Sequence, residues 1–184
     1  NGYANSNAQK TRTHQTNQCP NIIVYASPLF SLPMNQDEIL MNTDEAYMRR
    51  ALDEAQQAFD ADEVPVGAIV VCRDHIIARA HNLTETLTDV TAHAEMQAVT
   101  AAANALGGKY LDDCTLYVTV EPCTMCAGAL GWAQLGRLVY GAADPKRGYS
   151  RLAPQALHPK TEVCSGVLAE ECGQMMKDFF QRKR

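Results

Sequence analysis

The chain of 184 residues is long enough for one domain, or two at most, with a core that needs no disulfide bonds. Hydrophobic residues at 46% and charged residues at 20% lie close to globular averages, which excludes a disordered or fibrous protein. The net charge of −5 is unevenly spread: residues 1–136 carry 7 basic and 16 acidic side chains, net −9, whereas residues 137–184 carry 9 and 5, net +4.

No apolar run reaches the roughly 20 residues that a membrane-spanning helix requires, so we expect a soluble protein with no membrane partner. The seven cysteines are odd in number and lack the even spacing of a disulfide framework. This usage favours a reducing, cytoplasmic setting. Cys72, Cys114, Cys164 and Cys172 lie in apolar segments and are interpreted as core residues.

Residues 1–33 are predicted to be a flexible N-terminal extension. The first residue is Asn, so the chain either begins inside a longer one or carries a foreign addition, and residues 1–20 are too polar to be buried. The apolar stretch that follows is broken by Pro28 and Pro33, which argues against a signal peptide. The folded domain is therefore expected to be residues 34–184.

Helices and strands alternate along this domain after an opening hairpin with the turn Arg73-Asp74-His75. This order predicts one mixed sheet with helices on its faces, an α/β layered sandwich. In chain order, the expected elements are a helix from Thr43, strands Val66–Cys72 and Ile76–Ala80, a helix Ala92–Leu106, a strand Cys114–Val120, a helix Cys123–Gln134, a strand Arg137–Gly141, a short helix at Leu152–Leu157, a strand Thr161–Gly166 and a helix from Ala169.

Two short segments carry metal-binding residue types: Thr91 to Glu95, which reads Thr-Ala-His-Ala-Glu, and Glu121 to Cys126, which reads Glu-Pro-Cys-Thr-Met-Cys. A Cys-x-x-Cys pair places two sulfurs on one side of a helical turn, close enough to bind a single ion. Zinc prefers thiolate and imidazole ligands, so His93, Cys123 and Cys126 are the predicted metal ligands. Both segments begin predicted helices, where unpaired backbone N–H groups favour thiolate.

Glu95, two residues after His93, is the candidate catalytic residue. At a helix start both side chains can reach past the helix end, so Glu95 would stand beside the ion without binding it. Three protein ligands leave the fourth position open for a water, with which a carboxylate can exchange protons. The alternatives are a redox pair of cysteines or a structural metal site, whose fourth ligand would be Cys114, His81 or Cys72.

The pattern His-x-Glu followed by Pro-Cys-x-x-Cys is the signature of zinc nucleoside and nucleobase deaminases. Within that superfamily, which also contains the cytidine and deoxycytidylate deaminases, the chain resembles the bacterial tRNA adenosine deaminases from about Asp44 to Arg184. The matching blocks are Glu63–Ala68, Thr91–Glu95, Thr115–Thr119, Glu121–Ala129, Gly136-Arg137, Gly141-Ala142 and the closing helix with Phe179-Phe180 and its basic tail.

The resemblance implies a cytidine-deaminase-like fold, a three-layer α/β/α sandwich with a five-stranded mixed sheet, and a homodimer. It implies hydrolytic conversion of the wobble adenosine of a tRNA anticodon to inosine, with release of ammonia. By position, His93, Cys123 and Cys126 would bind Zn2+, and Glu95 would shuttle protons. Asn82 matches an Asn that contacts the flipped base, and its alternative interpretation is a turn residue that satisfies local backbone.

An anticodon loop offers the unstacked base that such a pocket requires, and basic residues would contact its phosphates. The acidic N-terminal helix is expected to face away from the RNA. The candidate phosphate contacts are Arg137, Lys146, Arg147, Arg151, Lys160 and Arg182–Arg184.

Three departures from the family pattern fall at positions that border the pocket or the RNA path. Gly131 to Gln134 replaces an apolar-His-Ser-Arg stretch, Val90 stands where Pro is common, and Gly148 to His158 lacks a Gly-Ser-Leu-Met type of sequence. Trp132, inside the first departure, is interpreted as a core residue, with a stacking platform for a base as the alternative.

Two other functions stay open at this point. The first is a deaminase of a free nucleobase or nucleoside, of the guanine or cytosine type, which would use the same metal and the same Glu95. The second is a non-catalytic, zinc-stabilised partner subunit, against which the intact Glu95 speaks.

Overall fold

The structure, a computed structural model, describes residues 44–184, so the prediction of a flexible extension at residues 1–33 lies outside the described residues. The helices are α2 (Asp44–Asp60), α3 (Ala94–Leu106), α4 (Thr124–Trp132), α5 (Tyr149–Leu152) and α6 (Ala169–Arg182). The strands are β1 (Gly67–Cys72), β2 (His75–His81), β3 (Cys114–Val120), β4 (Arg137–Ala142) and β5 (Glu162–Ser165).

The strands form one mixed sheet in the order β2-β1-β3-β4-β5. β1 pairs antiparallel with β2 and with β3, whereas β3, β4 and β5 run parallel. The central strand β3 is buried along most of its length, which explains its nearly continuous apolar sequence. Because β3 and β4 are parallel, the carboxyl end of β3 is followed by a crossover helix, α4.

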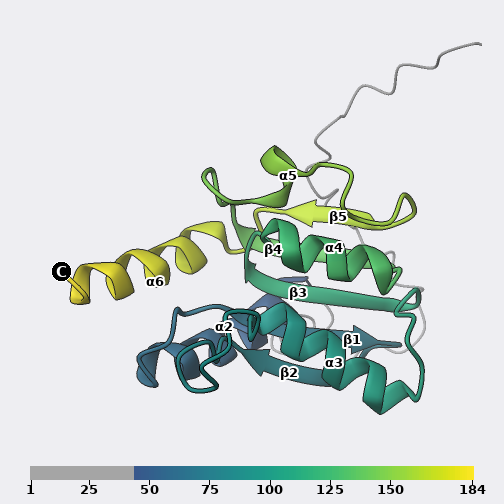
Figure 1. Cartoon of the computed structure of the whole chain (residues 1–184), viewed down its shortest axis with the longest axis horizontal. Helices are drawn as coiled ribbons and strands as arrows, with labels where there is room; N and C mark the ends of the chain where they lie inside the picture. The colour runs from purple at the N-terminus through teal and green to yellow at the C-terminus, as the bar shows by residue number, and fades with distance from the viewer. Residues whose placement is uncertain (1–43) are drawn as a thin grey trace, which may run out of the picture.

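Helices cover both faces of the sheet, as Figure 1 shows. On one face, small alanines of α3 and residues of α4 pack on β1, β3 and β4. On the other face, Met48 and Ala51 of α2 and Cys172 of α6 pack on Ile69, Tyr117 and neighbouring strand residues. The predicted three-layer α/β/α sandwich with a five-stranded mixed sheet is therefore confirmed.

A close approach of α2 to β1 depends on Gly67, the first residue of β1. A Cβ at this position would lie 2.1 Å from the backbone oxygen of Ala51 and 2.3 Å from the backbone nitrogen of Ala55, both in α2. No side chain fits in that space. Gly67 thus allows the helix to lie against the strand, and any larger residue would push the two apart.

Two local predictions differ from the structure. The β1–β2 hairpin turns over two residues, Arg73 and Asp74, rather than three, and both have positive φ, of 49° and 62°. A two-residue turn with this conformation matches the twist of the flanking strands, and Asp tolerates it. The short helix comes at Tyr149–Leu152, earlier than expected, because the backbone N–H of Tyr149 donates to the carbonyl of Pro122 and fixes the start of the segment.

Within residues 44–184, none of the helices has the length and apolar character needed to cross a membrane.

The first residue of α2 is tied to β4. The guanidinium of Arg137 donates to both carboxylate oxygens of Asp44, each at 2.7 Å, and the Tyr117 hydroxyl donates to the same carboxylate at 2.9 Å. The hydrogen bonds from Arg137 hold the pKa of Asp44 below its ordinary value of 3.8, although partial burial acts in the opposite direction. A bidentate pair of this kind is geometrically specific and fixes the helix start over the sheet.

We predict that Asp44→Asn lowers the free energy of unfolding at pH 7 by about 1 kcal/mol, because a charge-assisted pair is lost at a partly exposed site. Since the folded-state pKa of Asp44 is depressed, its contribution is complete above pH 3.8 and disappears as the pH falls through the folded-state value. Urea unfolding of both proteins at a series of pH values measures the difference. The matched control is Asp53→Asn, which removes an exposed pair with Arg50 in the same helix, and an equal effect of both substitutions would contradict the prediction.

Candidate metal and catalytic site

The structure brings His93, Cys123 and Cys126 together, although 30 residues separate the first two in the sequence. His93 precedes the first residue of α3, Cys123 precedes the first residue of α4, and Cys126 lies in the first turn of α4. His93 Nδ1 lies 3.7 Å from Cys123 Sγ and 3.5 Å from Cys126 Sγ. All three potential ligand atoms lie within 4.8 Å of one another.

These distances fit one tetrahedral ion. With metal–sulfur bonds of about 2.3 Å and a metal–nitrogen bond of about 2.05 Å, tetrahedral angles separate sulfur from nitrogen by about 3.6 Å. Within the described residues the group contains no fourth His, Cys, Asp or Glu ligand. The geometry therefore suits a metal ion with one position open to solvent or substrate, and it does not suit a closed structural site.

The charges of the three groups support this use. The Cys126 thiol donates to Cys123, and together with His93 it lowers the pKa of Cys123 to about 4. The same contact with Cys123, together with burial, raises the pKa of Cys126, while the hydrogen bond with Cys123 raises the pKa of His93. One thiolate thus forms readily even before a cation is present. A bound cation would release the second thiol proton.

Glu95 lies in the first turn of α3, two residues after His93, and its side chain is buried with a relative exposure of 4%. Burial raises the pKa of its carboxyl group above the usual value, because the charged form loses hydration. The Cys126 thiol lies close enough to Glu95 to act in the opposite direction. A carboxyl group whose protonated form is favoured by burial can accept a proton and give it up again.

Asn82 follows the last residue of β2 and lies beside this site. The next backbone N–H, that of Leu83, donates to the carbonyl of Ala92, the residue before His93. The side-chain amide of Asn82 is buried and donates to Glu63 Oε2 at 3.0 Å and to Thr84 Oγ1 at 2.9 Å. Because a carboxylate only accepts, the NH2 group must face Glu63, and the amide oxygen is the group that Asn82 can offer to a ligand.

Glu63 organises the loop that carries this side of the site. It has no exposed surface and accepts hydrogen bonds from the Asn82 amide, the Thr84 hydroxyl and the backbone N–H groups of Glu85 and Thr86. Burial alone would raise its pKa, but the N–H donors of Thr86 and Glu85 reverse this and lower it. Glu63 is therefore a fully bonded carboxylate that fixes the orientation of Asn82.

A second buried carboxylate, Glu121, organises the opposite side. It accepts backbone N–H groups of Asp144 at 2.9 Å and Ser150 at 3.0 Å. Gly148 forms an isolated bridge with Cys123, and a Cβ on this glycine would lie 2.4 Å from the Glu121 carboxylate. Glu121 and Gly148 together hold the loop after β4 against the segment that carries the cysteines.

Sequence reasoning gave no role to Glu63 or Glu121, although both lie in segments that matched the family. The available signal is a carboxylate at or next to an apolar, proline-containing segment: Glu63 directly precedes Val64-Pro65, and Glu121 lies between Val120 and Pro122. A carboxylate inside an apolar segment must be paired or hydrogen-bonded, which makes it a candidate anchor for a loop. The sequence could not identify its partners, because they are mostly backbone groups.

The basic residues are arranged differently from the expectation. Arg137 pairs with Asp44, and Arg182 and Lys183 pair with Asp62 at the end of α2. The guanidinium of Arg182 also lies 4.3 Å from the ring centre of Phe59. These cations therefore lie against α2 and the segment that follows it, and not apart from the acidic N-terminal helix.

Trp132 is not a core residue, and that interpretation was wrong. It is the last residue of α4 and has a relative exposure of 87%. The helix ends at this residue, and two residues later Gln134 adopts a left-handed φ of 52°. Cys114, Cys164 and Cys172 are buried as expected, whereas Cys72 is only partly buried.

The sheet order, the two helix starts that meet over it and the buried carboxyl group define a deaminase of the cytidine-deaminase-like class. The model of the MafB19-like deaminase family matches residues 42–184, and the chain belongs to this family. The resemblance to deaminases that the sequence motifs indicated is confirmed.

Similar proteins include the tRNA-specific adenosine deaminase of Bacillus subtilis, which is 48% identical over 149 residues that cover 78% of this chain and 92% of that protein. A solved structure from a study of A-to-I editing by tRNA:A34 deaminases at the wobble position is 43% identical, with a TM-score of 0.67. The match covers 71% of this chain and 98% of that chain. The guanine deaminase of Bacillus subtilis is 40% identical, with a TM-score of 0.53, over 55% of this chain and 65% of that chain.

We predict that Glu63→Gln lowers the free energy of unfolding by about 2–4 kcal/mol, because the new NH2 group would face donors at a site with no exposed surface. Hydrogen exchange of the Glu85 and Thr86 amides should accelerate, since both donate to this carboxylate. Glu85→Gln is the matched control: it changes an exposed carboxylate of the same loop and keeps that loop's backbone bonds. Unchanged exchange of these amides in Glu63→Gln would contradict the anchoring role.

Proposed function

We propose that the protein is a zinc-dependent hydrolytic deaminase that converts adenosine to inosine at the wobble position of tRNA anticodons. The observation that carries the proposal is the cluster of His93, Cys123 and Cys126 beside a buried Glu95. The relatives named as tRNA-specific adenosine deaminases, and the neighbour described as a tRNA:A34 deaminase, support the choice of substrate.

Zinc is the proposed ion because two sulfurs and one imidazole nitrogen form a ligand set that it prefers, at separations that suit tetrahedral bonds. When bound, zinc would supply a water whose pKa lies near 7 and an electrophilic centre for the reaction. The protein's part is to hold the ion rigidly. The starts of α3 and α4 do this, because each ligand precedes or begins a helix that is packed on the sheet.

Glu95 is the proposed proton carrier. Its carboxylate would take a proton from the attacking water and deliver one to ring nitrogen N1 of adenine, and it would later help to protonate the departing amino group. The overall change consumes one water and releases one ammonia. The raised pKa of Glu95 suits a group that must both accept and donate.

Asn82 is the proposed base contact. Its amide NH2 is held by Glu63 and Thr84, so the oxygen of the amide is left to accept a hydrogen bond from the substrate. Glu63 would act through Asn82 and is a positioning residue.

The RNA phosphates would be contacted by cations of the loop after β4 and the segment before β5. Lys146, Arg147 and Lys160 are exposed, and their side chains form no salt bridge within residues 44–184. The proposed contacts do not include Arg137, Arg182 and Lys183, because these cations already pair with acidic groups of α2 and the segment after it.

A tRNA substrate would place the enzyme in the cytoplasm. We also propose that the protein forms a homodimer, on the strength of the resemblance to the tRNA adenosine deaminases. Sedimentation equilibrium measures the mass of the particle and so tests this proposal.

A deaminase of free guanine is the second candidate, supported by the 40% identity to the guanine deaminase of Bacillus subtilis. It would use the same metal ligands and the same Glu95. Residues 131–134 depart from the sequence pattern of the tRNA deaminases, and this departure is compatible with a substrate other than tRNA. Substrate size distinguishes the two, because only the first requires an RNA loop.

The test offers the zinc-loaded protein an anticodon stem-loop with adenosine at the wobble position, the same RNA with that adenosine moved into the stem, and free adenosine, guanine and cytosine. Inosine is read by sequencing and ammonia by a coupled assay. We expect inosine only at the wobble position of the first RNA. Ammonia from guanine or cytosine, with no change to the RNA, would favour the second candidate, and no ammonia from any substrate would overturn hydrolytic deamination.

We predict that Glu95→Gln reduces turnover by about 10²- to 10⁴-fold, the usual contribution of a general acid–base group. The bound metal should stay at one per chain, because the Glu95 carboxyl is not among the three clustered ligand atoms. Turnover and metal content are measured on the same preparation. Glu170→Gln, in the exposed first turn of α6, is the control and should leave both unchanged. Near-normal turnover in Glu95→Gln, or loss of the metal, would contradict the role given to this residue.

A further inference from the structure

Cys72 and Cys114 face each other across two neighbouring strands, far from the metal cluster. Cys72 is the last residue of β1, Cys114 is the first of β3, and the two are direct partners in the antiparallel ladder. Directly opposed residues project from the same side of the sheet, here the side covered by α3 and α4. Neither cysteine has a place in the deaminase site.

The backbone around the pair brings the sulfurs close. The N–H of Cys114 donates to the carbonyl of Leu111 at 3.0 Å, so the two cysteines do not exchange backbone hydrogen bonds with each other. Opposed residues without such bonds have Cα atoms about 4.5 Å apart and side chains that approach closely. Cα separations of about 4.4–6.8 Å are compatible with a disulfide. Both thiols are reduced, and Cys72 lies close enough to Cys114 to raise its pKa.

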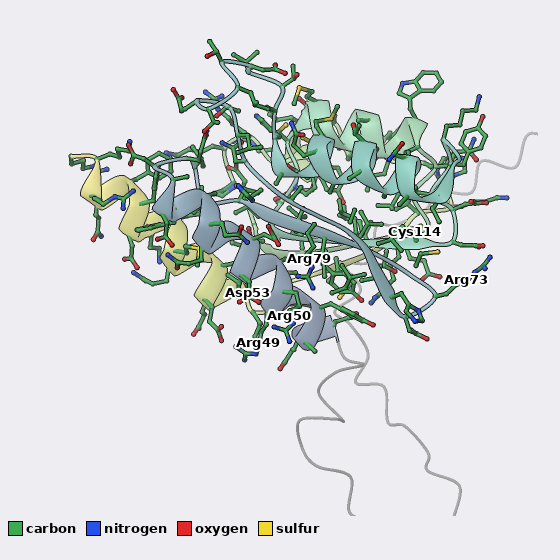
Figure 2. The ribbon with its side chains drawn as sticks, turned by 90° about the horizontal axis from the view of Figure 1, so that it is seen from below. Arg49, Arg50, Asp53, Arg73, Arg79 and Cys114 are labelled. Atoms are coloured by element: carbon green, nitrogen blue, oxygen red, sulfur yellow. The ribbon has the colours of Figure 1, made fainter. Side chains whose placement is uncertain are left out.

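A cavity of about 500 Å³ opens onto the pair. Cys72 and Cys114 line it together with His75, Tyr110 and Asp113. Figure 2 shows Cys114 and Arg73 at the same end of the molecule, opposite the end from which α6 projects. A small molecule in this cavity would therefore lie against the strand ends that carry Cys72 and Cys114.

The two thiols differ in access. Cys72 is partly exposed, whereas Cys114 has a relative exposure of 2%. Burial and the contact with Cys72 raise the pKa of Cys114 to about 12, so Cys114 stays protonated near neutral pH. Cys72 is therefore the sulfur that a reagent in the cavity reaches first, and Cys114 is placed to react second.

A metal ion does not explain the pair. Within the described residues, the cluster of three potential ligands that could hold an ion is the one at His93. A zinc site of the usual kind needs four ligands, of which the protein supplies at least three. In the part of the chain that the structure describes, these two opposed sulfurs belong to no group of three potential ligands, so their placement suits a bond between the two sulfurs.

We propose that Cys72 and Cys114 form a reversible dithiol–disulfide modification site that is oxidised by hydrogen peroxide. The Cys72 thiol loses its proton, and the thiolate attacks one oxygen of the peroxide. The O–O bond breaks, Cys72 becomes a sulfenic acid, and the hydroxide released takes up the proton from Cys72 and leaves as one water. The Cys114 sulfur attacks the Cys72 sulfur, the S–S bond forms, and the sulfenic oxygen leaves with the Cys114 proton as a second water. Two thiols and one peroxide thus give one disulfide and two waters, and dithiothreitol reverses the change.

The disulfide would act on stability and not on the deaminase chemistry. Cys114 is the first residue of β3, and the segment that carries Cys123 follows the last residue of this strand. The two ends of β3 are six residues apart, which is about 20 Å along the strand. A covalent link between β1 and β3 closes a long loop that includes β2 and α3, which restricts the unfolded chain. We therefore expect a higher melting temperature and unchanged turnover.

The test treats the reduced, zinc-loaded protein with stoichiometric hydrogen peroxide and then alkylates the remaining thiols before proteolysis and mass spectrometry. We expect a peptide pair linked through Cys72 and Cys114, a rise in Tm of about 5–10 °C, turnover within twofold of the untreated protein, and full reversal by dithiothreitol. The linked peptide should be absent from Cys114→Ala, where dimedone should instead trap the sulfenic acid of Cys72.

Cys172→Ala is the matched control, because it removes a buried thiol on the opposite face of the sheet, and it should leave the linked peptide unchanged. If Cys114→Ala does not fold, Cys72→Ser removes the more exposed sulfur and should abolish the same peptide. Recovery of Cys72 and Cys114 as separately alkylated thiols would overturn the proposal. So would oxidation of Cys123 and Cys126 before any 72–114 link appears. Because the readout is a peptide mass, failure of this proposal is separate from failure of the proposed deaminase activity.

Discussion

The structure depends on two helix starts that meet at one point over the sheet. α3 and α4 pack side by side on the same face, and each begins with a residue that can bind a metal ion, His93 or Cys123. Their unpaired backbone N–H groups provide a positive potential that favours thiolate. Because both helices are buried against β1, β3 and β4, the ligand atoms are held in place before an ion arrives, which is what a catalytic metal site needs.

Two buried carboxylates extend this rigidity to the loops around the site. Glu63 holds the segment after β2, and with it Asn82, while Glu121 holds the segment after β4 next to Cys123. Each is satisfied by donors that belong mainly to the backbone. Such a carboxylate fixes loop conformation without competing for the metal, so the chain can keep irregular, substrate-facing segments on a stable sheet.

The sequence predicted the fold and the segments that bring His93, Cys123 and Cys126 together, because both depend on local patterns. The strand Cys114–Val120 was predicted with its observed bounds, since it is buried on both faces, and His93 and Cys123 were expected at helix starts, where they lie. Residues whose environment depends on distant partners were not predictable in this way. Trp132 is apolar yet exposed, and Arg137 was assigned to RNA phosphates although Asp44, 93 residues earlier, binds it.

X-ray absorption at the zinc edge of the purified, zinc-loaded protein decides whether His93, Cys123 and Cys126 form an open metal site, because it counts the atoms bound to the ion. We expect two sulfurs at about 2.3 Å and two nitrogen or oxygen atoms at about 2.0–2.1 Å, one from His93 and one from an exchangeable water. Cys126→Ser should remove one sulfur from that count. A shell of three or four sulfurs, or one with no exchangeable oxygen, would mean a closed structural site and would rule out the open site.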